Sequence, residues 1–574
     1  MRVTFINPAP LFRRLGIYRW GADVYGHPDS ITGPLILAGI VSRAGHEVEV
    51  YEELNGKFDM DRLIERTDVL CLYTMTSSAK RAYQLADMFH EKGHARVIIG
   101  GMHASALPEE ALEHADQVLV GEGENIILDA VEGRLTDPIV RADPICDLDT
   151  VPFPDYSLLK TPCEAADILT SRGCPFRCTF CTTSRMFAPY RKRSVDNVIE
   201  EVRLYKEMGF EYMNFEDDNF TADKERAKEI CRRMIDEGLV FKQTFFFGRT
   251  DMADDPELLD LLAEAHLTRV LIGIESLNQD SLDIINKHQT VDDIERAGIA
   301  CKEHGIEVIA SIVLGLDGDY MSDIENSIDF ARRIDAYQLQ PAVLTPFPGT
   351  PVYEQYQREN RMIMNDVNEW SCFDMMNATY QPRHLSPWEL QMEFCDMARR
   401  FYTRRSAVRM GFLFGAEYGW RRYGLALSAF YGTFATWAAG TFAYGTTYYK
   451  VKHTDWMFKD DPDNIADRKR RAEEHSLPGI IKKSGEKFAE FVKPENFWKR
   501  VERVGDDISI AARRKLNEKK LSEKPDPFAD VPKRPMPSEK AIIPLKIFVA
   551  AQVALPVVLL AVFLNKNSKA GSQG

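Results

Sequence analysis

Short apolar, β-rich runs alternate with segments of helical periodicity from the start of the chain to about residue 355, and this alternation restricts the fold more than any other feature. Such a chain folds as a parallel sheet whose strands are joined by crossover helices. Over residues 1–145 the expected strands are Val3–Asn7, Val48–Tyr51, Val69–Tyr73, Val97–Gly101 and Val118–Val120. We therefore predict a Rossmann-like, flavodoxin-type domain that binds ligands at the carboxyl ends of its strands.

The Pro-rich connector Val151–Asp155 precedes a second alternating unit, which we assign to residues 150–355. Its expected strands are Ile168–Thr170, Tyr212–Glu216, Phe245–Phe247, Val270–Gly273, Val308–Leu314 and Ala342–Thr345. Six βα units predict a partial TIM barrel, (β/α)6, with its chemistry on the loops that follow the strands.

The rest of the chain changes character after residue 355. Residues 356–450 are expected to form a helical C-terminal domain. In it, small residues recur every four positions between 423 and 449, which suits either a buried helix or a helix that enters a membrane. Residues 451–540 are polar and predict a linker. Residues 545–566 include the uncharged run Ile547–Leu564 and predict a C-terminal transmembrane helix, with a buried core helix as the alternative.

Composition limits the partners and the compartment. The formal net charge of −15 argues against nucleic-acid binding. Ten cysteines in 574 residues are too few for a disulfide scaffold, and the opening residues resemble a buried strand more than a signal peptide. Basic residues are more numerous before the predicted membrane segment than after it, which predicts an enzyme body on the cytoplasmic face of a membrane, anchored at the C-terminus.

Glycines gather after two successive strands of the first domain. The runs are Gly100-Gly101-Met102-His103 and Gly121-Glu122-Gly123-Glu124. Glycine allows close approach of the backbone to a ligand, so these loops indicate a site for a large cofactor. The alternative is that the glycines only make tight turns between strand and helix.

Three cysteines, Cys174, Cys178 and Cys181, lie within eight residues after the first strand of the second unit. Thiolates hold iron–sulphur clusters, and a [4Fe–4S] cubane held by three of them keeps one iron open. A structural zinc site is the alternative, but it requires four ligands, and no second cysteine pair or Cys/His knuckle occurs in the sequence.

The Cys-x3-Cys-x2-Cys spacing, with Phe180 before the last cysteine, resembles the signature of the radical S-adenosylmethionine superfamily. Five further features resemble its later motifs: Phe215–Phe220, Arg249, Gly273–Ser276, Ile312–Asp317 and Thr345–Thr350. The resemblance implies that Glu216, Asp217 and Arg249 orient the methionine end of S-adenosylmethionine, and that Glu275 and Ser276 hold its ribose.

The first domain resembles the cobalamin-binding domain fused to many of these enzymes, among them the anaerobic magnesium-protoporphyrin monomethyl ester cyclase, the phosphinate methylase and the hopanoid methylases. The residues that the resemblance places at cobalamin are Gly100, Gly101, His103, Gly121, Glu122 and Gly123. The Asp-x-His-x-x-Gly motif of other cobalamin proteins is absent, so a domain that no longer binds cobalamin is the alternative.

The resemblance implies cleavage of S-adenosylmethionine at the cluster to a 5′-deoxyadenosyl radical, with electrons from a flavodoxin or ferredoxin. The implied reaction acts on an unactivated carbon, and methyl transfer is favoured over oxidative cyclisation. Because of the predicted anchor, we expect a hydrophobic membrane-associated substrate: a lipid, an isoprenoid or a tetrapyrrole. A cobalamin or redox sensor without turnover is the alternative from another class.

Overall fold

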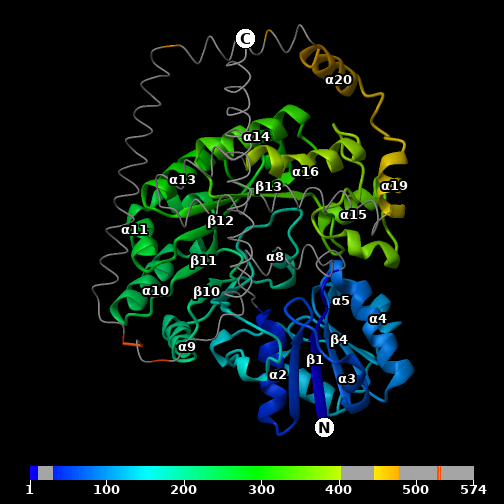
Figure 1. Ribbon diagram of the computed structural model, residues 1–574, viewed down its shortest axis with the longest axis vertical. Coiled ribbons are helices and arrows are strands. Elements are labelled where there is room, and N and C mark those ends of the chain that lie inside the picture. The colour runs from blue at the N-terminus through cyan, green and yellow to red at the C-terminus, as the bar shows by residue number, and fades with distance from the viewer. Residues whose placement is uncertain are drawn as a thin grey trace, which may run out of the picture.

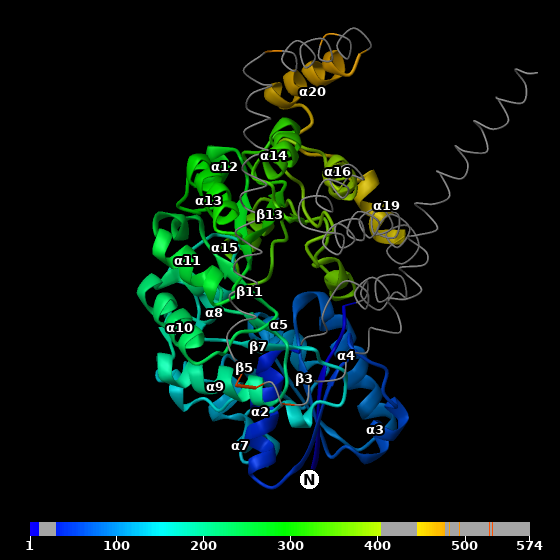
Figure 2. The same ribbon diagram turned by 60° about the vertical axis from the view of Figure 1, so that its left-hand side comes forward.

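The computed structural model describes residues 1–10, 30–402 and 445–476, and five single residues beyond them (482, 493, 527, 528 and 531). Two α/β domains form the body of the described chain. The first domain, drawn in blue, lies at the bottom of Figures 1 and 2, and the second, drawn mainly in green, lies above it. The helix α8 (Thr183–Met186) lies between them in Figure 1.

The first domain is built on a six-stranded parallel sheet in the order β2-β1-β3-β4-β5-β6. Its strands are β1 (Arg2–Asn7), β2 (Glu47–Glu52), β3 (Val69–Tyr73), β4 (Arg96–Gly100), β5 (Gln117–Val120) and β6 (Ile139–Arg141). The first five strands have the flavodoxin-like order, with the switch point between β1 and β3. The sequence analysis did not predict β6, because a strand of only three residues is too short to show a periodic pattern.

Helices cover this sheet with their apolar faces. They are α2 (Thr32–Arg43), α3 (Met60–Arg66), α4 (Thr76–Lys92), α5 (Met102–Ala106), α6 (Pro108–Leu112) and α7 (Ile127–Val131), with the 3-10 turn η2 (Gly123–Asn125) before α7. In α4 the spacing of Ala79, Ala82, Leu85, Ala86 and Phe89 gives one continuous stripe, and all five residues are fully buried.

The connector between the domains contains the 3-10 turns η3 (Leu148–Thr150) and η4 (Tyr156–Leu158). Tyr156 is buried, and its hydroxyl accepts a hydrogen bond from the backbone of Asp167 at 2.8 Å. The connector is therefore packed against the second domain.

The second domain has a six-stranded parallel sheet in the order β14-β13-β12-β11-β10-β7. Its strands are β7 (Ala165–Ile168), β10 (Tyr212–Phe215), β11 (Gln243–Gly248), β12 (Arg269–Glu275), β13 (Glu307–Leu314) and β14 (Gln338–Val343). A separate antiparallel hairpin joins β8 (Ser171–Arg172) to β9 (Arg191–Lys192). The first strand of this unit, expected at Ile168–Thr170, is β7, which lies earlier in the chain. The expected and observed ranges share only Ile168.

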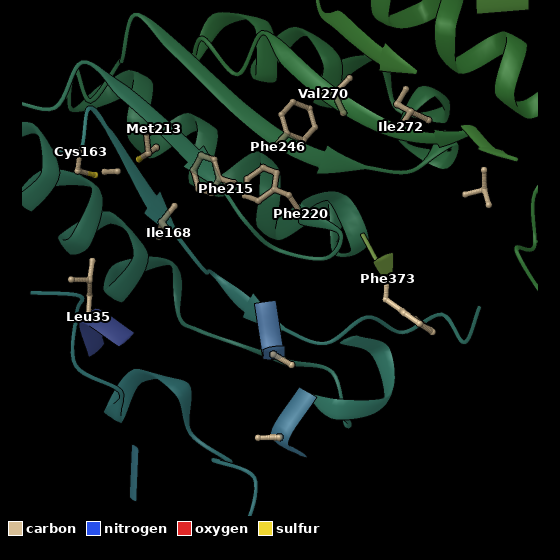
Figure 3. Packing of buried hydrophobic residues seen from close by; sticks show 14 of the residues in the cluster. Leu35, Cys163, Ile168, Met213, Phe215, Phe220, Phe246, Val270, Ile272 and Phe373 are labelled. Carbon is tan, nitrogen blue, oxygen red and sulfur yellow. The ribbon is translucent and has the colours of Figure 1, made fainter. Parts of the chain in front are cut away.

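The barrel helices alternate with these strands. They are α9 (Val195–Glu207), α10 (Lys224–Asp236), α11 (Pro256–Glu264), α12 (Gln279–Ile284), α13 (Val291–Glu303) and α14 (Met321–Arg333), with the 3-10 turns η5 (Phe220–Ala222) and η6 (Thr250–Asp254). Aromatic rings fill the space inside: Phe220 lies 4.5 Å from Phe215 and 5.9 Å from Phe246 between ring centroids, and Figure 3 shows the three together.

The described C-terminal part consists of α15 (Pro351–Arg358), η7 (Val367–Cys372), α16 (Pro387–Phe401), α19 (Gly445–His453) and α20 (Pro462–Glu474). The helix α16 contacts β14 and α14, so this part packs on the barrel. Arg361 is buried over the ring of Tyr356, which stacks on Tyr380, and it makes a two-pronged ion pair with Asp317 that fixes the loop following β13.

The predicted fold class requires a correction. The α/β fold with two domains fits, but none of the helices that the structure describes is long and apolar enough to cross a bilayer, which contradicts the predicted transmembrane helix. The residues on which that prediction fell, 545–566, lie outside the described part of the chain, as do most of 423–449 and of the predicted linker 451–540.

Candidate functional site

A cavity of about 780 Å³ lies between the two domains, at the carboxyl ends of the strands of both sheets. From the first domain it is lined by residues that end or follow β1, β3, β4 and β5. From the second domain it is lined by the loops after β8, β10, β11 and β12. Neither domain encloses this space alone, so the site depends on both.

All three cysteines of the triplet line the cavity. They lie on the loop between the strands of the β8–β9 hairpin, and all are free thiols. Burial raises the pKa of Cys174 to about 11 and also raises the pKa of Cys178. The ligand form is the thiolate, so cluster assembly here releases protons.

The donor set fits a cubane. Among the described residues, no three His, Cys, Asp or Glu side chains converge on a single metal ion. A cubane takes one thiolate per iron, so its ligands need not meet at one point as zinc ligands do. Cys174, Cys178 and Cys181 would hold the cluster.

A segment that the sequence analysis did not single out supports the cysteine loop. Ile285 accepts a hydrogen bond from the backbone of Thr179 at 3.0 Å, and the side chain of Asn286 donates to the carbonyl of Arg177 at 3.0 Å. Asn286 and His288 both have positive φ angles, 56° and 53°. Non-glycine residues in this region are strained, and such strain is typical of functional sites.

The three acidic residues that follow β10, Glu216, Asp217 and Asp218, have different surroundings. Asp217 is fully buried and accepts hydrogen bonds from the hydroxyls of Thr170 (3.0 Å) and Ser171 (2.5 Å), and burial raises its pKa. It therefore anchors the strand that leads into the cysteine loop. Glu216 and Asp218 both line the cavity. Burial raises the pKa of Asp218 to about 6, and the sequence analysis passed this residue over.

Arg249 lies over the ring of Phe176, 3.7 Å from the ring centroid, and both residues line the cavity. Its Nη2 donates to the carbonyl of Lys287 at 2.6 Å, while its buried Nε has no hydrogen-bond partner among the described residues. A buried guanidinium with a spare donor fits a carboxylate ligand. This geometry fits the methionine end of S-adenosylmethionine.

Glu275 also lines the cavity, where its Oε1 lies 2.5 Å from Nζ of Lys287. Its φ angle of 61° places this glutamate in the left-handed region. Lys287 is a further cavity residue that the sequence analysis missed. Because Lys287 lies far from Glu275 in the sequence, no local motif connects the two residues.

Ser276 is buried behind the site and does not line the cavity. Its hydroxyl donates to Oδ1 of Asp319 at 2.6 Å, and Ser281 donates to the same oxygen at 2.5 Å. Burial raises the pKa of Asp319 to about 7. The expected ribose contact of Ser276 is therefore replaced here by a contact that fixes the loop after β12.

Asp319 gives a pH-dependent prediction. Its pKa in the folded chain lies above the ordinary value of an aspartate, so the folded state holds the proton more tightly and the free energy of unfolding falls as pH rises from about 4 to about 7. The variant Asp319→Asn stays neutral and keeps an acceptor for both serines. We expect it to gain up to about 4 kcal/mol over the wild type at about pH 8 and little at about pH 4. Thermal melts at both pH values check this. The exposed Asp61→Asn is the control, and an equal gain at both pH values would refute the assignment.

Glycines form the wall of the first domain. Gly100, Gly101, Gly121 and Gly123 all line the cavity. Gly101 has a φ of 103°, and a Cβ there would lie 2.7 Å from the backbone N and O of Thr74. Gly121 has a φ of 89°. A side chain at Gly101 is therefore excluded by the backbone of Thr74 behind it. Together the four glycines present backbone to the cavity, which fits close approach by a large cofactor such as cobalamin.

Two other residues expected at cobalamin are placed differently. His103 is buried and does not line the cavity. Its ring nitrogens lie 3.2 Å from Oγ1 of Thr76 and 3.1 Å from Oε1 of Glu110, and Trp370 donates to the same carboxylate. Glu122 lines the cavity, but its carboxylate is held by arginines of the second domain.

Comparisons with known proteins agree with this architecture. A family model described as the B12 binding domain matches residues 30–131, and one described as the radical SAM superfamily matches residues 168–331. A radical SAM domain takes a [4Fe–4S] cluster and S-adenosylmethionine and needs a reductant, and a B12-binding domain takes cobalamin.

Three similar proteins illustrate the resemblance. The chain is 27% identical over 408 residues to the bacteriochlorophyllide d C-12(1)-methyltransferase of Chlorobaculum tepidum, covering 67% of this chain and 87% of that protein. It is 24% identical over 467 residues to the anaerobic magnesium-protoporphyrin IX monomethyl ester cyclase of Cereibacter sphaeroides, covering 74% and 72%. A solved structure, the cobalamin-dependent S-adenosylmethionine radical enzyme OxsB with aqua-cobalamin bound, superposes with a TM-score of 0.56 at 14% identity, covering 91% of this chain and 84% of that one.

The structural likeness shows the shared fold, and the two domain matches place the cysteine triplet and the glycine loops in their respective domains. The same matches decide against a sensor without turnover and in favour of an enzyme. The two domain matches, together with the methyltransferases and the cyclase among the similar proteins, indicate a cobalamin-dependent radical S-adenosylmethionine enzyme.

Proposed function

We propose that the protein transfers a methyl group to a carbon atom of a large, mainly apolar substrate, and that this substrate is a tetrapyrrole. One observation carries the proposal: the cysteine loop and the glycine wall line a single cavity. A methyl donor held by the first domain and a hydrogen abstractor held by the second would therefore reach the same substrate. Relatives that are named for bacteriochlorophyllide methylation and for magnesium-protoporphyrin cyclisation support the tetrapyrrole class.

The cavity wall supports an apolar substrate. Much of it is aliphatic or aromatic, and the residues concerned include Phe5, Ile6, Ile36, Leu72, Ile98, Leu119, Phe247, Leu271 and Phe347. Apolar walls bind a ligand by removing its apolar surface from water, at about 25 cal/mol per Å². A few polar groups, among them Asp218, would orient it.

The chain's own residues would position and shield the reaction. When bound, the cluster supplies one-electron cleavage of S-adenosylmethionine, and cobalamin supplies methyl-transfer chemistry. Arg249 would bind the methionine carboxylate, and Glu216 would accept hydrogen bonds from the methionine ammonium group. Lys287 would hold Glu275 in place through their ion pair. The aromatic and aliphatic wall would keep water from the radical.

Product mass tests the proposal. The anaerobically reconstituted enzyme would be given S-adenosylmethionine with a deuterated methyl group, a reductant and either a bacteriochlorophyllide or magnesium-protoporphyrin monomethyl ester. We expect a product in which a CD3 group replaces one hydrogen of the substrate, with 5′-deoxyadenosine and S-adenosylhomocysteine, and none of this product when cobalamin is omitted. Turnover only on water-soluble small molecules would refute the substrate class.

Oxidative cyclisation is the second candidate. It is favoured by the extent of the match, since the cyclase aligns with 74% of this chain and the methyltransferase with 67%. A product that has lost hydrogen or gained oxygen, with no label from the methyl group, would establish cyclisation in place of methyl transfer.

A further inference from the structure

Glu122 is the centre of a buried ion-pair group that crosses between the domains. Arg191 donates from Nη1 to Oε2 of Glu122 at 2.9 Å and from Nη2 to Oε1 at 2.5 Å. The backbone N–H of Ile145, in the connector between the domains, donates to Oε2 at 2.8 Å. Glu122 is 6% exposed and Arg191 8% exposed. This carboxylate therefore joins the glycine wall, the connector and the cysteine loop.

The hairpin that receives Glu122 has an unfavourable charge arrangement of its own. In the antiparallel register Arg172 lies directly opposite Arg191. Like charges opposite each other destabilise a strand pair. The compensating carboxylates come from the first domain: Arg172 lies 3.3 Å from Glu122 and 2.5 Å from Glu124. Among the described residues, the carboxylates that pair with Arg172 and Arg191 thus belong to the first domain.

The same hairpin closes the base of the cysteine loop. Arg191 also donates to carbonyl groups within that loop, to Pro189 at 3.0 Å and to Phe187 at 3.3 Å. Gly173 follows Arg172, and a Cβ at Gly173 would lie 2.5 Å from the carbonyl oxygen of Phe187. Gly173 is therefore packed against Phe187, so the two ends of the cysteine loop meet next to Cys174.

Glu122 is in the charge state that a counter-ion of Arg172 and Arg191 needs. Burial alone would raise its pKa, but the hydrogen bonds from Arg191 and from the backbone of Ile145, together with the nearby arginine charges, hold its pKa below the usual range. The carboxylate is therefore ionised at neutral pH, as a counter-ion must be.

We propose that Glu122 and Glu124 are positioning residues that close the hairpin at the base of the cysteine loop, so that cobalamin binding and the order of the cluster loop are coupled. Gly121 and Gly123, which flank Glu122, line the cavity, so cobalamin bound there orders the segment that carries both glutamates. Coupling of this kind is reciprocal, because each occupied site favours the same arrangement of the ion pairs. The proposal does not depend on which substrate the enzyme uses.

Hydrogen–deuterium exchange on the full chain, reconstituted with its cluster and measured with and without hydroxocobalamin, tests the proposal. In the wild type, cobalamin is expected to slow exchange in peptides covering 171–192. In Glu122→Gln, exchange there is expected to be about tenfold faster, because a charge-assisted hydrogen-bond pair is lost, and no longer slowed by cobalamin. The electron paramagnetic resonance spectrum of the reduced cluster should shift on cobalamin addition in the wild type only.

Glu201→Gln is the matched control. Glu201 is equally buried and is paired with Arg193 and Tyr205, but all three residues belong to the second domain. It should lower stability while keeping the effect of cobalamin on 171–192. If Glu122→Gln does not fold, Glu124→Gln, which removes only one arginine contact, should show the same loss in weaker form. Retention of the cobalamin effect in Glu122→Gln, or its equal loss in Glu201→Gln, would overturn the proposal.

Discussion

A Cys178→Ala variant, reconstituted anaerobically with iron and sulphide, is expected to hold no stable [4Fe–4S] cluster and to form no 5′-deoxyadenosine. Cys178 is buried at the cavity wall between the other two cysteines of the loop. A cubane held by three thiolates loses a third of its protein ligands, and no other group of three His, Cys, Asp or Glu side chains among the described residues is arranged to hold a metal. Iron content, the visible absorption spectrum and product analysis check the expectation.

Cys301→Ala is the matched control for this prediction. Cys301 is fully buried in α13, away from the cavity, and its replacement leaves only a small void. It should cost about 1 kcal/mol of stability while iron content stays at the wild-type level. Equal iron content in both variants would show that the loop does not hold the cluster.

Gly101→Ala is expected to lower the affinity for hydroxocobalamin by about 100-fold and to leave the iron content unchanged. The φ of 103° is strained for any L-residue, at about 1–3 kcal/mol, and the new Cβ would meet Thr74 N and O at 2.7 Å. The N–H and the hydroxyl of Thr74 both donate to the carbonyl of Gly100. Thr74 can therefore give way to the new Cβ only if the glycine wall moves with it. Titration with hydroxocobalamin, followed by absorption, measures the loss.

Gly45→Ala separates the clash from the backbone strain. Gly45 has a similar φ of 93°, lies in the same domain, and has no atom within 4 Å of the position of a Cβ. It should lose stability and keep its affinity for cobalamin. If both variants lose affinity equally, the glycine wall is not the binding surface.

Local patterns in the sequence predicted the features that local chemistry determines. The βα alternation placed five of the six strands of the first sheet, and β6 was missed because a three-residue strand is too short to show a periodic pattern. The cysteine triplet was found because its three ligands lie on one short loop. The transmembrane helix was predicted from hydrophobicity alone, and the described helices do not include one.

Residues positioned by distant contacts were harder to place. His103 and Glu122 were expected at cobalamin because they lie in glycine-rich loops, but Glu110 and Arg191 hold their side chains. Asp218 could have been found, because it belongs to the same acidic run as Glu216 and Asp217, and all three line the cavity. Lys287 can be recognised as a site residue only in the folded structure, where it forms an ion pair with Glu275.

The two sheets present their carboxyl ends to one space, and this arrangement has an electrostatic consequence. The helix α2 starts at the cavity wall with Thr32 and Gly33, and α5 starts there with Met102. Helix macrodipoles place partial positive charge at such ends. The cavity wall carries more carboxylates than cations, so positive charge in it is confined to these helix starts and to Arg172, Arg249 and Lys287. An anionic group such as a methionine carboxylate would be stabilised only next to one of them, which restricts how it can lie in the space between the domains.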